Sequence, residues 1–153
     1  MLTLYVDADA CPVKEEIYRV TKRYSFPVVV VANAEMRISA SPLVSLVVRT
    51  GFGGVDDWIA GRVGPGDLVV TADVPLAARC VAAGALVLDT KGHPLTDANV
   101  GEALATRNLF EELRQSGTVR GGPAPMTPRD RSRFLSRLDE LVNTVRRLFP
   151  PPV

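Results

Sequence analysis

Residues 2–12 read Leu2-Thr3-Leu4-Tyr5-Val6-Asp7-Ala8-Asp9-Ala10-Cys11-Pro12, a short apolar run that leads directly into two acids. An ionised carboxylate resists removal from water, and two neighbouring carboxylates repel each other. A divalent cation, or a reaction that uses paired carboxylates, would offset that cost. The pattern recurs, because residues 68–71 lead into Asp73 and residues 86–88 lead into Asp89. Three apolar runs that end in acids predict an acidic site along one edge of a sheet.

Further apolar runs alternate with segments of helical periodicity. Residues 28–31 and 46–48 are expected strands, whereas apolar residues between Val13 and Tyr24 recur at the spacing of one helix face. Buried runs of Val and Leu between helices indicate a parallel sheet that is covered on both faces. We therefore expect a three-layer α/β/α fold with a mainly parallel sheet of about five strands, the first of which is central. Ligands of such sheets bind at the carboxyl ends of the strands.

The chain beyond Asp97 is predicted to be helical. Val100 and Leu104 share one helix face, whereas Leu109 and Leu113 lie nearly opposite, which predicts a break near Arg107-Asn108 and two shorter helices. Residues 121–125 predict a stiff loop rather than a domain linker. A final helix is expected over about 128–148, and its apolar stripe would dock on the core or on a partner. The stripe consists of Phe134, Leu138, Leu141, Val145 and Leu148.

Length and composition indicate one α/β domain that spans residues 1–153, with a basic loop and helix over 114–153 packed on it. Residues 1–113 carry ten Lys/Arg and fourteen Asp/Glu, a net charge of −4, whereas residues 114–153 carry eight Arg and three acids, a net charge of +5. This division suits metal binding in the body and polyanion contact in the tail, although an arginine-rich helix can also be a solvated surface.

Targeting segments and the numbers of cysteine and histidine residues bear on the cellular location of the protein and on which metals it can bind. No signal peptide and no stretch long enough to span a bilayer is recognised, so we expect a cytoplasmic protein without membrane contact, as a monomer or a homodimer. The chain has two cysteines far apart in sequence, and His93 is its single histidine. Four nitrogen or sulfur ligands for zinc cannot be assembled from this set.

Carboxylates are therefore the candidate metal ligands. Asp7 and Asp9 follow the first strand, Asp56 begins a short helix after the third, and Asp73 follows the fourth. Oxygen ligands suit Mg²⁺ or Mn²⁺, and Mg²⁺ is commonly held by one or two carboxylates together with waters and phosphate oxygens. The alternative interpretation is that Asp56 and Asp73 only cap helices, for which aspartate is well suited.

Several long motifs resemble the YaiI/YqxD family of uncharacterised bacterial proteins. They are DADACPVK (7–14), VAN (31–33), GF…DDWI (51–59), TADVPLAARC (71–80) and GGP with a following DRSRF (121–134). That family is placed with the PIN-like nuclease folds, which include the NYN domains. The resemblance implies a metal-dependent hydrolase that cleaves RNA phosphodiesters.

The resemblance also implies residue roles. The pattern of PIN-like nucleases is an acid after the first strand, an acid at the start of a mid-chain helix, and Thr-x-Asp after a later strand, which Asp7, Asp56 and Thr71-Ala72-Asp73 match in order. Asp57 is an adjacent substitute for Asp56, and Asp9 would be a further ligand. A fourth acid soon after Asp73 is absent, and Asp89 is the nearest candidate. With two cations, one would activate water and the other would stabilise the leaving oxygen.

Basic residues are candidates for phosphate contact. Lys14 lies one helical turn beyond Cys11, Arg49 ends the third strand, and several arginines follow in the tail. Such residues can follow a nucleic-acid backbone, but they carry no sequence readout. Their alternative role is surface solubility. The tail candidates are Arg129, Arg131, Arg133 and Arg137.

Two other functions compete with RNA hydrolysis. One is a catalytically inactive module of the same fold that binds metal or RNA. The other is a haloacid-dehalogenase-like phosphatase, in which the first acid of Asp-x-Asp is a nucleophile and the second a general acid. That chemistry usually needs Gly-Asp after a later strand, whereas Gly66-Asp67 precedes its strand here.

Overall fold

The computed structural model describes residues 2–9, 11–119 and 125–150 of the 153-residue chain. Its centre is a six-stranded sheet in the order β3-β2-β1-β4-β5-β6, in which the first five strands run parallel and β6 is antiparallel to β5. The prediction of a mainly parallel sheet with a central first strand is confirmed. The strands are β1 (Leu4–Asp7), β2 (Val28–Ala32), β3 (Val44–Val48), β4 (Leu68–Val70), β5 (Leu86–Leu88) and β6 (Pro94–Leu95).

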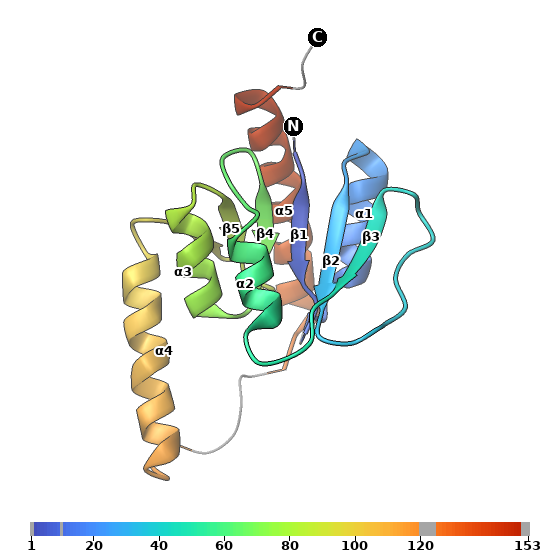
Figure 1. Cartoon of the computed structure of the whole chain (residues 1–153). Coiled ribbons are helices and arrows are strands. Elements are labelled where there is room, and N and C mark those ends of the chain that lie inside the picture. Colours follow the sequence, from blue (N-terminus) through green and yellow to red (C-terminus); the bar gives the residue numbers. More distant parts are fainter. Residues whose placement is uncertain (1, 10, 120–124, 151–153) are drawn as a thin grey trace.

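Helices cover both faces of this sheet, as expected for three layers (Figure 1). α1 and α5 lie together on one face, α2 and α3 lie on the other, and α4 packs against α3. Within the described residues, no helix is both long and apolar enough to cross a bilayer. The helices are α1 (Lys14–Tyr24), α2 (Gly54–Ala60), α3 (Val74–Ala82), α4 (Val100–Gln115) and α5 (Pro128–Leu148).

Alternation along β1 decides which side chains reach each layer. Leu4 and Val6 are buried in the core beneath α1 and α5, whereas Tyr5 packs with the core beneath α2 and α3. Because successive side chains of a strand point to opposite faces, Asp7 belongs to the same face as Tyr5. The register of β1 with β4 pairs Tyr5 with Val69. Two residues further on, Asp7 and Thr71 therefore share the face that α2 and α3 cover.

The final helix forms as predicted and lies against α1. Thr127 and Asp130 form a reciprocal capping box at its start, and Pro128 occupies the first turn, where proline is well tolerated. The stripe is buried within the single chain, which assigns it to the core. Its membership differs from the prediction at three positions, because Val142 is fully buried, Leu141 is half-buried, and Leu148 is 64% exposed at the helix end.

The predicted break near Arg107-Asn108 is wrong, because α4 is one continuous helix. The prediction assumed that every apolar residue of this segment must face the core. Instead α4 contacts α3, and its second half projects past the body (Figure 1), with Leu109 54% and Phe110 45% exposed. No tertiary requirement therefore bends the helix.

Strand β6 was not predicted, and it adds a sixth strand to the expected five. Two residues are too few for an alternation pattern, and Pro94 argues against a strand in most settings. Here Pro94 lies on the last strand of the sheet, where a proline is tolerated. The predicted stiff loop over 121–125 falls, apart from Pro125, outside the described residues.

Because Phe134 has no exposed surface and joins α5 to the core, Phe134→Ala should lower the free energy of unfolding by about 3–5 kcal/mol. Urea denaturation followed by circular dichroism measures this change. Leu148→Ala, at the exposed end of the same helix, is the matched control and should change stability by less than about 0.5 kcal/mol. Equal effects of the two substitutions would contradict the assignment of the stripe to the core.

Candidate functional site

A buried carboxylate and a buried hydroxyl meet at the ends of the two central strands. Asp7 is the last residue of β1 and is 8% exposed, and Thr71 directly follows β4 and is fully buried. The Thr71 hydroxyl donates a hydrogen bond of 2.8 Å to Asp7 Oδ2. This donor supplies part of the stabilisation that the carboxylate loses when it leaves water.

The same hydroxyl links Asp7 to Asp73. The backbone N–H of Asp73 donates to Thr71 Oγ1 at 2.9 Å, and Asp73 Oδ1 in turn accepts a hydrogen bond of 2.9 Å from the backbone N–H of Leu76. Asp73 is therefore the N-cap of α3, the role that the sequence analysis gave as the alternative to metal binding. One of its carboxylate oxygens makes the cap, and the residue still lies beside Asp7 through Thr71.

Four carboxylates influence one another at this edge of the sheet. Burial raises the pKa of Asp7 to about 6, the Thr71 hydrogen bond opposes that rise, and the charges of Asp56, Asp73 and Asp9 add to it. The pKa of Asp56 is raised by burial and then by the charge of Asp73, against the influence of Arg79. Asp7, Asp9, Asp56 and Asp73, the four acids that the sequence analysis selected as metal ligands, therefore lie within range of one another's charges.

The donor set of this cluster suits a hard cation, since every candidate ligand is a carboxylate oxygen. Asp9 and Asp56 line a small polar cavity of about 100 Å³, together with Asn33 and the glycines of the loop before α2. Within the described residues, however, no group of three acidic, histidine or cysteine side chains is close enough to hold a metal ion directly. The arrangement fits an ion that keeps part of its water shell and takes one or two carboxylates, as Mg²⁺ commonly does.

The structure separates Asp56 from Asp57. Asp57 is on the exposed side of α2, where its Oδ1 accepts a hydrogen bond of 2.9 Å from the Arg79 guanidinium. Asp56 instead responds to the charges of Asp73 and Asp9. Of the two adjacent acids, Asp56 is the one that belongs to the carboxylate cluster.

Asp89 lies in the turn between β5 and β6. Its Oδ1 accepts hydrogen bonds from the backbone N–H groups of Lys91 and His93, and its Oδ2 lies 3.3 Å from His93 Nδ1. The charge of Asp89 is not among those that shift the pKa of Asp7 or Asp56. These contacts give Asp89 a role in shaping the turn.

The predicted phosphate contact Lys14 is engaged with the backbone. Its Nζ donates to the carbonyl oxygens of Cys11 at 2.8 Å and Ala8 at 3.3 Å, on the loop that carries Asp9. Lys14 therefore holds that loop closed against the start of α1. Its position one helical turn beyond Cys11 indicated proximity to the acids, but the sequence did not show that loop carbonyls would occupy the ammonium.

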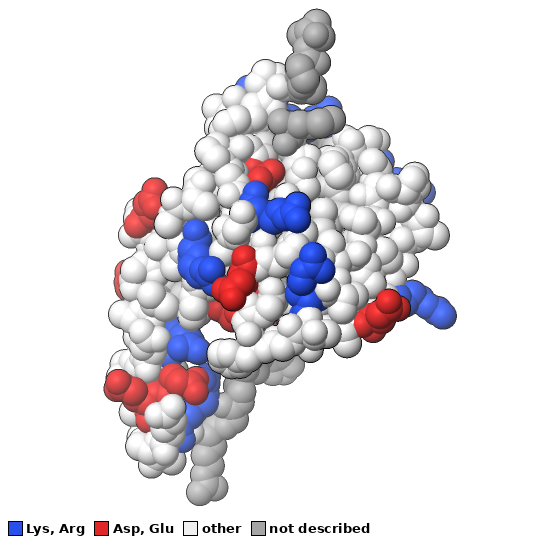
Figure 2. Space-filling view, in the orientation of Figure 1, with Lys and Arg blue, Asp and Glu red and all other residues white. Residues whose placement is uncertain are grey.

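Arginines gather on the outer face of α2. The guanidinium carbons of Arg49 and Arg62 lie 5.6 and 4.6 Å from the centre of the Trp58 ring, and Arg79 pairs with Asp57. Figure 2 shows basic side chains around an acidic one on this face. Arg49 was a sequence candidate, whereas Arg62 and Arg79 were not, because nothing in their local sequence sets them apart from other surface arginines.

The tail arginines lie on α5, across the sheet from α2. Arg131 donates to the Pro12 carbonyl oxygen at 2.7 Å and pairs with Glu16, and Arg133 contacts Asp130, His93 and the Lys91 carbonyl oxygen. Arg137 lies 3.7 Å from Glu140, and no ion pair of Arg129 is found within the described part of the chain. Arg131 and Arg133 thus connect α5 to loops of the body.

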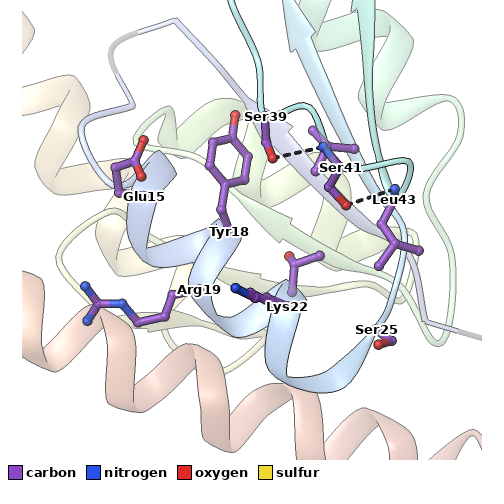
Figure 3. Close-up of a pocket in the computed structure, with 10 residues that line it drawn as sticks. Glu15, Tyr18, Arg19, Lys22, Ser25, Ser39, Ser41 and Leu43 are labelled. Atoms are coloured by element: carbon purple, nitrogen blue, oxygen red, sulfur yellow. Dashed lines mark hydrogen bonds between the residues drawn. The ribbon is translucent and has the colours of Figure 1, made fainter.

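A cavity of about 520 Å³ lies away from the acids (Figure 3). It is bounded by α1 and by the segment that leads into β3, where Ser39 and Ser41 accept hydrogen bonds from backbone N–H groups. None of the four clustered carboxylates lines it. Its size therefore does not make it the catalytic candidate.

Fold and site together define a doubly wound α/β protein with an acidic crevice at the carboxyl edge of its sheet, beside the point where the strand order reverses. The chain belongs to the uncharacterised bacterial YaiI/YqxD family, whose model matches residues 5–144.

Similar proteins support this assignment over nearly the whole chain. A UPF0178 protein of Rhodopseudomonas palustris strain BisB5 is 55% identical over 97% of this chain and 92% of its own length. UPF0178 proteins of Bradyrhizobium sp. strain ORS 278 and Nitrobacter winogradskyi are 53% and 51% identical, each over 95% of this chain, and 90% and 94% of their own lengths. No solved structure matches the chain.

The raised pKa of Asp7 predicts a specific dependence of stability on pH. The ordinary value is 3.8 and the folded value is about 6, so the folded chain retains a proton that the unfolded chain has lost between these values. Stability should therefore fall as the pH rises from about 4 to about 6, and the loss should be complete above that range. Asp7→Asn, which cannot ionise, should raise the free energy of unfolding by about 1–2 kcal/mol at pH 7.5 and by little at pH 4. Urea melts at both pH values measure this, and equal shifts would contradict it.

The bridging role of Thr71 predicts different effects for two small substitutions. Thr71→Val keeps the shape but removes the donor to Asp7 and the acceptor for the Asp73 N–H, so it should lower the free energy of unfolding by about 1–3 kcal/mol. Thr71→Ser keeps the hydroxyl and should lose clearly less. Thermal melts of both variants compare them, and a valine variant as stable as the serine variant would show that the bridge is unimportant.

Proposed function

We propose that the protein is a divalent-metal-dependent ribonuclease-like hydrolase that cleaves RNA phosphodiesters at the carboxylate cluster. The observation that carries this proposal is the gathering of Asp9, Asp56 and Asp73 around the buried Asp7 at the end of the central strand. A carboxylate whose pKa is raised by burial and by neighbouring charges marks a candidate functional site. The match of Asp7, Asp56 and Thr71-Ala72-Asp73 to the pattern of PIN-like nucleases adds support from resemblance.

Each acid has a distinct part in this proposal. Asp7 and Asp73 would hold Mg²⁺ or Mn²⁺, Asp56 would complete the ligand set or orient the attacking water, and Asp9 would be a ligand or an acceptor for bound water. When bound, the ion lowers the pKa of a coordinated water and neutralises charge on the phosphate. Thr71 positions Asp7 by its hydrogen bond, and Lys14 positions the loop that carries Asp9.

An inactive metal- or RNA-binding module is the second candidate. It is favoured by the absence, within the described residues, of three acids close enough to bind one ion directly, and by the hairpin contacts that occupy Asp89. Such a module would keep the cation response of the cluster and show no turnover.

A haloacid-dehalogenase-like phosphatase is disfavoured by the surroundings of Asp7 and Asp67. Burial and a hydrogen bond make Asp7 a weak nucleophile, because a nucleophilic carboxylate must be ionised and accessible. Asp67 precedes β4 and accepts a hydrogen bond from the Gly64 N–H, at the end of the strand opposite to the carboxylate cluster.

Mn²⁺ or Mg²⁺ should raise the melting temperature of the protein, because an ion that binds the folded state alone stabilises it. Asp7→Asn and Asp56→Asn should abolish this rise and also abolish metal-dependent cleavage of a labelled single-stranded RNA. Asp57→Asn, on the adjacent exposed position, is the matched control and should retain both responses.

Three outcomes separate the candidate functions. Cleavage of RNA that requires Asp7 supports the proposed hydrolase. A metal-dependent rise in melting temperature without cleavage of RNA or of a phosphomonoester supports the inactive module. No metal response and no cleavage would contradict both.

A further inference from the structure

Phe52 is the most exposed large apolar side chain in the described part of the chain, at 110% of its reference surface. It stands between two glycines with positive φ, Gly51 at +90° and Gly53 at +74°, a conformation that residues with a side chain rarely adopt. A lone aromatic ring in full contact with water contributes nothing to the core. The glycines around it nevertheless shape the loop so that the ring stays outside.

The loop that carries Phe52 is anchored by hydrogen bonds. Asn33 Nδ2 and the backbone N–H of Gly54 both donate to the Gly51 carbonyl oxygen at 3.3 Å, and the N–H of Asp57 donates to the Gly53 carbonyl oxygen at 2.9 Å. A Cβ atom at Gly54 would approach the Arg49 carbonyl oxygen to 3.3 Å, so the chain passes close to itself here. The exposure of Phe52 is therefore built into the loop on both sides.

This loop borders the carboxylate cluster. Gly51, Gly53 and Gly54 line the same small polar cavity as Asp9 and Asp56. In Figure 1 the loop joins the end of β3 to the start of α2 at the lower edge of the sheet, where β1 also ends. At about 100 Å³ the cavity suits a hydrated ion or a phosphate oxygen, but it is too small and too polar for a nucleobase with its sugar.

We propose that Phe52 is a stacking platform for an unpaired nucleobase of the strand whose phosphate reaches the carboxylate cluster. Bases of single strands stack on exposed aromatic side chains, and one ring is sufficient for one base. The base would rest on Phe52 outside the cavity, and its neighbouring phosphate would face Asp9 and Asp56. This inference rests on the proposed function for the position of the phosphate, and it adds that the substrate is a single-stranded segment.

Positively charged side chains near the Phe52 loop could contact the phosphates of a nucleic-acid strand. Acids alone would repel phosphates, but Arg49 directly precedes the loop, Arg62 shares the Trp58 ring with it, and Arg79 pairs with Asp57 of α2. Figure 2 shows basic side chains gathered on this face. These arginines offer a basic path for the strand on one side of the cluster. An apolar partner surface or a bilayer would instead need several adjacent apolar side chains, and the neighbours of Phe52 are glycines.

The test is the affinity of a fluorescein-labelled single-stranded RNA for the full-length protein with Asp7 intact, measured by anisotropy with Ca²⁺ in place of Mg²⁺, so that an oxygen-ligated cation is present while cleavage is suppressed. Phe52→Ala should weaken binding about 5- to 100-fold, the range expected for loss of one stacked base. Phe52→Trp should retain the affinity, and Phe52→Leu should lose it, because leucine is apolar but cannot stack. Since Phe52 is fully exposed, none of these changes should alter the melting temperature.

Phe110→Ala removes an exposed phenylalanine on α4 and is the matched control, which should leave RNA affinity unchanged. Single-stranded DNA of the same sequence should show the same dependence on Phe52 if the base alone is recognised, and duplex RNA should show none. Equal affinities of the alanine and phenylalanine forms would overturn the inference. So would full affinity in Phe52→Leu, or the dissociation of a dimer by Phe52→Ala in sedimentation, which would assign the ring to an interface between copies.

The outcomes keep the two proposals apart. RNA cleavage that is indifferent to Phe52 would overturn the stacking platform and leave the proposed hydrolase standing. Binding that depends on Phe52, in a protein that cleaves no RNA, would support the platform and overturn the hydrolase.

Discussion

A carboxylate can remain buried at the end of a central strand only if a donor reaches it, and in this protein the donor is the hydroxyl of Thr71. That hydroxyl also accepts the N–H of Asp73, so one side chain connects β1, the end of β4 and the start of α3. The position of Asp73 is therefore tied to that of Asp7 by covalent geometry and two hydrogen bonds. The crowding of charge around Asp7 follows from this short connection.

The topology of the sheet explains why the cluster lies where it does. β1 is flanked by β2 on one side and β4 on the other, so the connections that follow β1 and β4 leave in opposite directions along the sheet. Ligands of doubly wound sheets bind at such a reversal, at the carboxyl ends of the strands. α2 covers this edge of the sheet and contributes Asp56 from its first turn, while Trp58 packs inward against Tyr5 and has the guanidinium groups of Arg49 and Arg62 over its ring. One short helix thus borders both the acids and the arginines.

Periodicity and local motifs were sufficient for most of this arrangement. Continuous apolar runs predicted the parallel strands, and acids at the strand ends predicted that Asp7 and Asp73 would lie at one edge of the sheet, because parallel strands end together. The same argument also placed Asp89 there, whereas the structure uses Asp89 in the turn between β5 and β6. The roles of Lys14, Asp89 and Arg131 could not be predicted in this way, since each is decided by a backbone group that only the folded chain brings within reach. The continuity of α4 could not be predicted either, because it depends on how much of this helix packs against the rest of the protein. The exposure of Phe52 had a local signal in its flanking glycines, but a glycine-rich loop alone does not show which way a side chain points.

Because only the first part of α4 packs against the body, the two ends of this helix should open at different rates. Its first turns rest on α3, whereas the stretch around Leu109 and Phe110 is largely exposed and is held mainly by interactions within the helix, including the Glu111–Arg114 ion pair. A helical segment without tertiary contacts opens and closes locally, and its amides exchange with solvent without unfolding of the rest of the molecule. Protection against hydrogen exchange should therefore fall along α4 from Leu104 to Gln115, while the central strands β1 and β4 should exchange only through global unfolding. The edge of the sheet that carries the carboxylates should therefore be among the most stable parts of the chain, and the projecting end of α4 among the least stable.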